Sequence, residues 1–207
     1  GPLRSRKMAD ILAEVRNLEE ANFQELILTG THIGAYGEED GNEGYDLADV
    51  CAQILANSSI PRLRLGSIEP TEVTDKLLQL MVENPRMCRQ LHMPLQSGSD
   101  EVLKRMKRPY KTDDYRKIVK KAREMVPEVA ITTDIMVGFP GESNDDFRES
   151  LMFADEIAFA AMHIFKYSPR ENTPAAAMSD QVDSTLKDKR SKAMAAVAEK
   201  NELKYME

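Results

Sequence analysis

Apolar positions along the chain follow two periods that alternate with each other. Between residues 8 and 21 they return every three or four positions, which is the spacing of an amphipathic helix. Shorter runs alternate apolar and polar residues, as half-buried strands do. The expected helices are 8–21, 46–57, 71–83, a short one after Ser99, 112–126, one after Ser143 and 183–205, with Thr71, Ser99, Thr112 and Ser143 as caps. The expected strands are 25–29, 62–67, 90–95, 129–137 and 161–167. Repeated strand–helix units predict a parallel α/β sheet, either open or curled into a barrel.

Several expected strands have one apolar face and one face that carries polar groups. In 129–139 the odd positions are apolar except for one threonine, whereas the even positions include Thr132 and Asp134. A sheet that is covered on both faces is apolar on both. The alternation therefore predicts a wet interior that binds a ligand. A closed polar network, for instance Arg64 paired with Asp134, is the alternative.

Four strands end in segments rich in glycine and small polar residues. They are "TGTHIGAYG" (29–37), "LGSIEP" (65–70), "MPLQSGSDEVLKRMKRPY" (93–110) and "VGFPGE" (137–142). Glycine permits close approach to the backbone, and the ends of barrel strands are where ligands bind. Gln96 and Ser97 offer neutral groups suited to ribose hydroxyls. Val137 and Phe139 suit an apolar wall for a purine; the alternative is a tight strand–helix junction, with Glu142 favouring the helix start.

Composition narrows the possible functions. The 207 residues carry a net charge of −7 and no tryptophan, so the whole surface is not a nucleic-acid-binding one. No apolar run reaches the length of a membrane span and no signal peptide is visible, which predicts a cytoplasmic protein without membrane contact. Cys51 and Cys88 are isolated, which is typical of reduced structural thiols, and the three histidines lack metal-site spacing.

Five segments in this order resemble the radical SAM core of the methylthiotransferases. They are "LTGTHIGAYG", "LRLGSIEP", "HMPLQSGSDEVLKRMKRPY", "ITTDIMVGFPGE" and "KYSPRENTPAA". The resemblance covers about residues 3–178 and implies a partial (β/α)6 barrel. It also implies S-adenosyl-L-methionine (SAM) as cofactor and a 4Fe–4S cluster that cleaves SAM to a 5′-deoxyadenosyl radical. A second cluster would help to deliver sulfur, and the substrate would be a tRNA anticodon loop.

Three subgroups of this family compete. "TGTHIGAYG" and "GSIEP" most resemble the enzyme that acts on C2 of N6-threonylcarbamoyladenosine at position 37 of tRNA. The isopentenyladenosine enzyme usually has "GQNVNSY", and the ribosomal-protein aspartate enzyme has "PLQH" where this chain has "PLQS". Outside the family, a cluster-free barrel lyase or isomerase and a non-catalytic SAM-binding scaffold remain alternatives.

The chain departs from the family in lacking the CxxxCxxC motif that holds the cluster. We expect residues 1–207 to be a single core domain that begins just after the cluster loop, without metal ligands of its own and inactive alone. The N-terminal methylthiotransferase domain and the C-terminal RNA-binding domain would lie outside it. Contact with tRNA would come from those domains or from the basic runs 104–108 and 116–123, of which the second has the helical spacing of a solvated face. The sequence identifies neither the sulfur donor nor the electron donor.

The resemblance implies cofactor contacts at eleven positions and assigns no catalytic residue. They are Gly30, Thr31, Ser67, Gln96, Ser97, Arg108, Asp134, Gly138, Phe139, Gly141 and Tyr167. The Gly30–Thr31 turn would lie near the methionine amino group, and Gly138–Glu142 at the adenine side. Arg108 would pair with the methionine carboxylate or else end a solvated charge run. Glu69 is either a ligand contact or a helix-entry residue.

Overall fold

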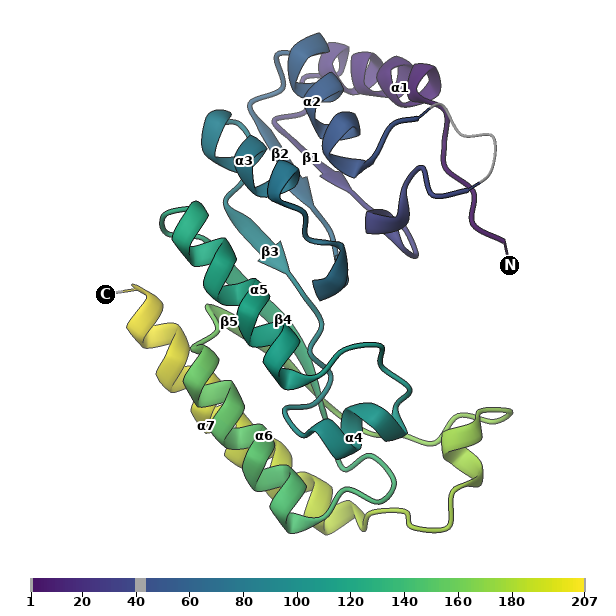
Figure 1. The fold of residues 1–207 in the computed structure, drawn as a ribbon, viewed down its shortest axis with the longest axis vertical. Coiled ribbons are helices and arrows are strands. Elements are labelled where there is room, and N and C mark those ends of the chain that lie inside the picture. Colours follow the sequence, from purple (N-terminus) through teal and green to yellow (C-terminus); the bar gives the residue numbers. More distant parts are fainter. Residues whose placement is uncertain (1, 40–43, 207) are drawn as a thin grey trace. The chain divides into compact units, whose positions relative to one another are not determined.

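The computed structural model describes residues 2–39 and 44–206 and divides the chain into two compact units (Figure 1). The first unit comprises the chain up to His92 together with residues 120–130. The second comprises residues 93–119 and the chain from Ile131 onward. Within the described ranges, no helix is long and apolar enough to cross a membrane.

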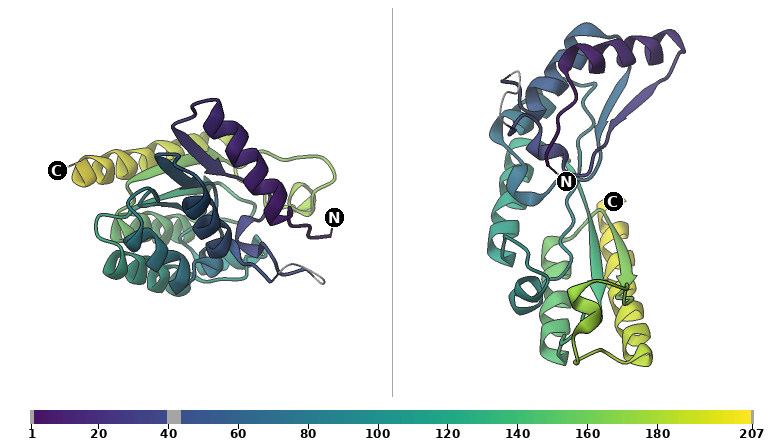
Figure 2. Two further views of the ribbon diagram at one scale, coloured as in Figure 1. Left: turned by 90° about the horizontal axis from the view of Figure 1, so that it is seen from above. Right: turned by 90° about the vertical axis from the view of Figure 1, so that its right-hand side faces the viewer.

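The first unit is built from short parallel strands and the helices that precede or follow them. β1 (Glu25–Leu28) pairs in parallel with β2 (Arg62–Leu65). Met87, which lies shortly before β3 (Gln90–His92), forms a parallel bridge with Leu63 of β2. The helices are α1 (Met8–Glu20), α2 (Leu47–Asn57) and α3 (Asp75–Glu83). Leu63 and Leu65 are 2% exposed, whereas Ile27 is 53% exposed. Figure 2 shows this unit's ribbon from two further sides.

The second unit contains the longest strand and the longest helix. β4 (Ala130–Val137) pairs in parallel with β5 (Ala161–Lys166), and residues 93–97 run beside β4. The helices are α4 (Asp100–Arg105), α5 (Thr112–Met125, of which the first part belongs here), α6 (Asn144–Ile157) and α7 (Ser184–Met206). α6 and α7 lie side by side (Figure 1), where Asn201 Nδ2 donates to the Ala154 carbonyl at 3.0 Å.

The alternation of buried and half-buried positions confirms the two-faced strands. Along β4 the odd positions are buried and the even ones, including Asp134, are half-buried. The pairing of Arg64 with Asp134, given as an example of the alternative polar network, is wrong. Arg64 Nε donates to Glu25 at 2.8 Å instead. Parallel strand–helix units are thus confirmed, and closure of the sheet into a (β/α)6 barrel stays a prediction.

Only one of the four expected caps acts as predicted. The Ser143 hydroxyl accepts the Asp146 N–H at 3.1 Å, as a capping residue does. Thr71 lies instead in the 3₁₀ helix Pro70–Glu72, and α3 is capped by Thr74. Ser99 precedes α4, but its hydroxyl donates to the Asp146 carboxylate at 2.7 Å. Thr112 is already the first residue of α5.

Replacing Thr74 by alanine tests the corrected start of α3. The Thr74 hydroxyl accepts the N–H of Leu77 at 3.2 Å, so its loss should lower the free energy of unfolding by about 1 kcal/mol. Thr71→Ala is the matched control, because Thr71 is exposed and precedes the helix. Urea titrations followed by circular dichroism measure both variants. Equal effects of the two substitutions would contradict the assignment of the cap to Thr74.

Candidate functional site

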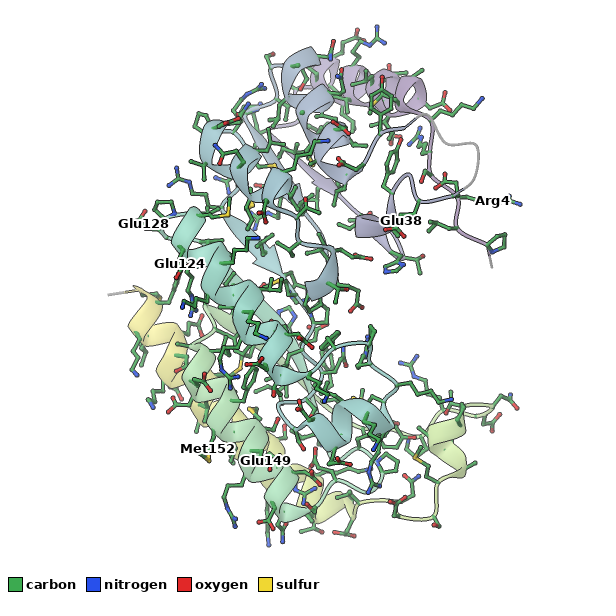
Figure 3. The ribbon with its side chains drawn as sticks, in the orientation of Figure 1. Arg4, Glu38, Glu124, Glu128, Glu149 and Met152 are labelled. Atoms are coloured by element: carbon green, nitrogen blue, oxygen red, sulfur yellow. The ribbon has the colours of Figure 1, made fainter. Side chains whose placement is uncertain are left out.

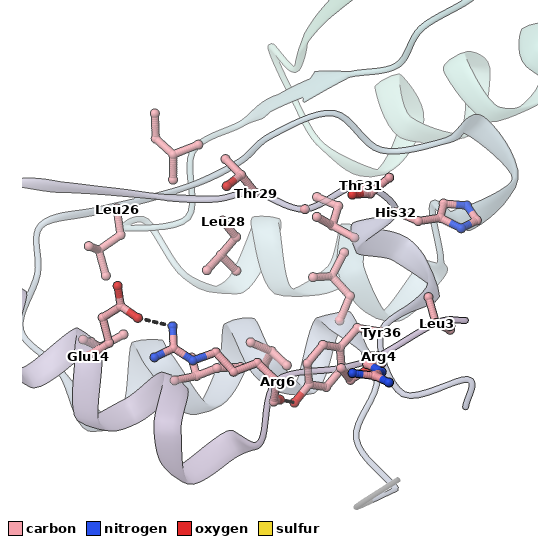
Figure 4. A pocket seen from close by; sticks show the side chains of 18 of the residues that line it. Leu3, Arg4, Arg6, Glu14, Leu26, Leu28, Thr29, Thr31, His32 and Tyr36 are labelled. Carbon is pink, nitrogen blue, oxygen red and sulfur yellow. Dashed lines mark hydrogen bonds and ion pairs between the residues drawn. The ribbon is translucent and has the colours of Figure 1, made fainter. Parts of the chain in front are cut away.

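The first unit contains a cavity of about 840 Å³ beside β1 (Figure 4). Ile11 and Val15 of α1 line it together with Leu26 and Leu28 of β1, and residues 2–6 complete the lining. Its volume is within the range of sites that hold small molecules. Its walls combine these apolar side chains with polar ones, and the polar groups are candidate ligand contacts.

Some of these polar groups lie where β1 runs into the following turn. Gly30 and Thr31, both predicted near the methionine part of SAM, are exposed and line this cavity together with His32 (Figure 4). His32 Nε2 lies against the carboxylate of Glu72, and burial raises the pKa of Glu72 above that of an ordinary carboxyl. The structure therefore brings two of the predicted residues together in one cavity, and their contact with SAM stays a prediction.

Ser67 and Glu69 follow the end of β2 but do not line this cavity. Ser67 is exposed and forms a parallel bridge with His92. Glu69 directly precedes the 3₁₀ helix Pro70–Glu72, and its N–H donates to the Glu72 carboxylate at 3.3 Å. The helix-entry interpretation of Glu69 is thus confirmed. A ligand contact at Ser67 remains a prediction.

In the second unit, β4 ends in a tight loop formed by residues 138–142. Gly138 and Gly141 have φ of +72° and +77°, a backbone region that favours glycine. The Gly138 N–H donates to Glu142 Oε1 at 2.9 Å, and the Glu142 N–H donates to the Phe139 carbonyl at 2.9 Å. The interpretation as a tight junction is confirmed, but Glu142 acts by closing the loop, while Ser143 caps α6.

A buried ion pair connects this loop to α7. Arg190 Nη1 donates to Glu142 Oε1 at 2.6 Å and to the Glu142 carbonyl at 3.1 Å, and the two side chains are only 3% and 1% exposed. Burial raises the pKa of Glu142, and the hydrogen bond from Gly138 and the charge of Arg190 oppose that rise. Arg190 was not predicted as a site residue. A single arginine in a long polar helix does not indicate that it is buried or which residue it pairs with.

Phe139 and Tyr167 form a small apolar cluster next to the loop. Their rings meet edge to face with centroids 5.3 Å apart, and their exposures are 7% and 8%. Val102 completes the buried part of the cluster, and Met106 and Met136 pack against it. Among the described residues the Tyr167 hydroxyl has no hydrogen-bond partner although it is buried. Such a group is costly unless something bonds to it, which marks this hydroxyl as a candidate ligand contact.

The remaining predicted contacts of the second unit lie on or near β4. Gln96 has φ of +68° and its N–H donates to the Asp134 carbonyl at 2.9 Å. Asp134 Oδ1 lies 3.3 Å from His163 Nδ1 on the neighbouring β5. Ser97 is fully buried, and its hydroxyl accepts the Ser99 N–H at 3.2 Å. Gln96 and Asp134 are thus brought together, whereas Ser97 has a structural partner.

Arg108 lies after α4, outside these groups. Its side chain is half-buried and its N–H donates to the Leu103 carbonyl at 2.9 Å. Neither of the two interpretations of Arg108, a carboxylate contact or the end of a solvated charge run, is tested by this geometry.

The basic run 116–123 on α5 is largely balanced by acidic partners. Arg116 Nη2 donates to Glu156 Oε2 at 3.0 Å, and Lys117 lies 2.7 Å from Asp113. Figure 3 shows acidic Glu124 on the same helix. Compensated, exposed pairs of this kind are typical of a solvated helix face.

The two cysteines do not fit an iron–sulfur cluster. Cys51 is buried within α2, and burial raises the pKa of its thiol to about 12, so that the thiol stays protonated at neutral pH. Cys88 is half-buried in the segment before β3. Cluster iron is held by several thiolates, which these two separate cysteines do not offer, and the absence of metal ligands from this chain stays a prediction.

Comparison with known proteins identifies the family. The profile of the Radical SAM superfamily matches residues 1–154, so the chain belongs to the radical SAM superfamily. Within it, the chain is similar to methylthiotransferases. It is 35% identical over 206 residues to the threonylcarbamoyladenosine tRNA methylthiotransferase MtaB of Bacillus subtilis (strain 168), covering 99% of this chain and 45% of that protein. It is 41% identical over 208 residues to the tRNA-2-methylthio-N(6)-dimethylallyladenosine synthase of Corynebacterium jeikeium (strain K411), covering 97% of this chain and 40% of that protein.

Solved structures share the fold. Coproporphyrinogen III oxidase (HemN) of Escherichia coli, described as a radical SAM enzyme, superposes with a TM-score of 0.69 at 15% identity, covering 94% of this chain and 45% of HemN. The radical SAM methyltransferase TsrM of Kitasatospora setae gives 0.64 at 16% identity, covering 83% of this chain and 33% of TsrM. At these identities the likeness concerns the fold alone.

The cysteine environments predict that this chain does not assemble a cluster by itself. Anaerobic reconstitution with iron and sulfide should leave no stoichiometric 4Fe–4S absorption, because Cys51 stays protonated and neither thiol has a neighbouring thiolate in its own segment. Iodoacetamide should alkylate Cys88 faster than Cys51 in the folded chain. A stoichiometric cluster signal that disappears in Cys51→Ala would contradict this account.

Proposed function

We propose that the parent protein adds a methylthio group to C2 of N6-threonylcarbamoyladenosine at position 37 of tRNA, and that this chain is its radical SAM core. The observation that carries the proposal is that tRNA methylthiotransferases match 97% to 99% of the chain. These relatives are more than twice as long as the matched part, so the chain spans less than half of each. Their additional length leaves room for a cluster loop and for an RNA-binding domain.

The second unit supports SAM as the cofactor of this chain. The loop 138–142 has two glycines with left-handed backbone, which give the tight turn at the end of β4 where the family resemblance places the adenine. The buried Tyr167 hydroxyl beside it has no partner among the described residues, as expected of a group that bonds to a ligand. These features suit the adenine side of SAM. When bound and cleaved, SAM would supply the radical, while residues of this chain bind and orient it.

In the first unit, the turn at Gly30 and Thr31 suits the methionine part. Both residues line the 840 Å³ cavity, and Gly30 exposes its backbone there. The ligands of the iron–sulfur cluster would lie in the parent protein outside this chain, because the two cysteines of the chain are isolated from each other in sequence.

A second candidate substrate is N6-dimethylallyladenosine in tRNA. The synthases that make its 2-methylthio form reach 41% and 42% identity, against 35% for MtaB. The threonylcarbamoyl assignment rests instead on "TGTHIGAYG" and "GSIEP" at the ends of β1 and β2. The segment after β1 lines the candidate cavity, where differences between subgroups bear on function more directly than the overall identity does.

Mass spectrometry of tRNA nucleosides decides between the two substrates. A strain that lacks the parent gene should lose the methylthio form of threonylcarbamoyladenosine and accumulate its precursor. The dimethylallyl methylthio nucleoside should stay unchanged and serves as the internal control. The opposite pattern would reject the threonylcarbamoyl assignment, and no change in either nucleoside would reject the proposed activity.

Substituting Tyr167 by phenylalanine tests whether its hydroxyl serves a ligand. Removing a buried group without a partner should raise the stability of the SAM-free protein and weaken SAM binding about fivefold, the equivalent of about 1 kcal/mol. Tyr205→Phe, at a tyrosine that is 49% exposed, is the control. Calorimetric titration and thermal unfolding measure both effects. Lower stability with unchanged SAM affinity would show that the hydroxyl has a structural role.

A further inference from the structure

We propose that Arg190 on α7 is a positioning residue, which fixes the loop 138–142 in the conformation that receives the adenine side of SAM. The inference rests on the proposed function, in which Gly138, Phe139 and Gly141 lie at that side. Arg190 itself does not contact the proposed ligand; it acts through Glu142.

By itself, the loop is closed by hydrogen bonds that all involve Glu142. The Glu142 carboxylate accepts the Gly138 N–H at 2.9 Å, and the Glu142 N–H donates to the Phe139 carbonyl at 2.9 Å. Gly138 and Gly141 have positive φ and therefore restrict the backbone less than other residues would. A loop with two such hinges needs an external constraint to keep one conformation.

Arg190 supplies such a constraint at Glu142, from a helix more than 40 residues further along the chain, while the Gly141 N–H donates to the Asp180 carbonyl at 2.8 Å. Its Nη1 donates both to the Glu142 carboxylate at 2.6 Å and to the Glu142 carbonyl at 3.1 Å. Its Nη2 donates to Asn144 Oδ1 at 3.0 Å, and the guanidinium lies 5.3 Å from the centre of the Phe147 ring. The planar guanidinium thus fixes backbone and side chain at the point where the loop enters α6.

Lys187, one turn earlier on α7, contacts the other end of the same loop. Its aliphatic part lies over Gly138, where a Cβ would come within 2.4 Å of Lys187 Cγ. Its Nζ donates to the Tyr167 carbonyl at 3.0 Å and lies 5.2 Å from the centre of the Tyr167 ring. α7 therefore contacts the loop at both ends, and also the strand end that carries the unpartnered hydroxyl.

The burial of the pair favours a positioning role over a purely stabilising one. Both side chains are at most 3% exposed, and burying two charges costs about as much as their attraction returns, so apolar residues of similar size would stabilise the fold at least as well. Apolar residues would not impose the directions of three hydrogen bonds. What Arg190 provides beyond stability is therefore that the loop keeps one geometry.

The test uses the full-length protein and S-adenosylhomocysteine as the binding probe, so that it does not depend on turnover. Arg190→Met should weaken binding about tenfold or more, because two charge-assisted hydrogen bonds to the loop are lost. Arg190→Lys should recover part of that loss, since an ammonium group reaches only some of the same acceptors. Lys200→Met is the matched control, because Lys200 lies on α7, is 51% exposed and pairs with Asp155.

The double variant Arg190→Met with Glu142→Gln separates positioning from folding. The glutamine oxygen can still accept the Gly138 N–H, and no buried carboxylate is left without its cation. We expect its urea stability to exceed that of Arg190→Met, while probe binding stays weak and amide exchange of the 138–142 peptide stays faster than in the wild type. Recovery of affinity together with stability would overturn the positioning role.

Two further outcomes are informative. Unchanged probe affinity in Arg190→Met, with normal binding by the wild type, would overturn this inference and leave the proposed function intact. A wild-type protein that does not bind S-adenosylhomocysteine at all would overturn the proposed function, and the role of Arg190 with it.

Discussion

The buried contact between Glu142 and Arg190 connects three parts of the second unit that are distant in sequence. β4 ends at Val137, the loop 138–142 turns the chain, and α6 starts at Asn144. Arg190 of α7 bonds to the last residue of that loop and to the first residue of α6. The strand end at Tyr167 is tied to the same helix by Lys187. Two cations on α7 thus contact the two strand ends of this unit that are proposed to receive SAM.

Sequence alone predicted the strands and helices well because their signals are local. The period-two alternation in 129–137 identified which side chains of β4 are buried, including Ile131 and Ile135 at 1% and 0% exposure. Ser143 was predictable as a cap because the N–H that its hydroxyl accepts, that of Asp146, lies only three residues away. Thr71 was chosen wrongly, since the chain forms a 3₁₀ helix first and Thr74 is better placed. Propensity does not decide between two threonines so close together.

The candidate site was predictable only where its residues are contiguous. "VGFPGE" indicated a special loop, and the glycines at 138 and 141 do have positive φ. The partner of Glu142 was not predictable, because Arg190 lies 48 residues away and its helix has no distinctive pattern there. Arg64 was paired with the wrong carboxylate for the same reason. Its partner Glu25 is opposite it only through the parallel pairing of β1 with β2.

We propose above all that the loop 138–142, held by α7, receives the adenine side of SAM. A crystal structure of the full-length protein, reconstituted under anaerobic conditions and bound to SAM, tests it most directly. The account predicts that the adenine lies against the backbone of Gly138–Gly141, that a SAM atom bonds to the Tyr167 hydroxyl, and that Arg190 keeps both bonds to Glu142. Adenine bound elsewhere, with this loop in contact only with protein, would contradict it.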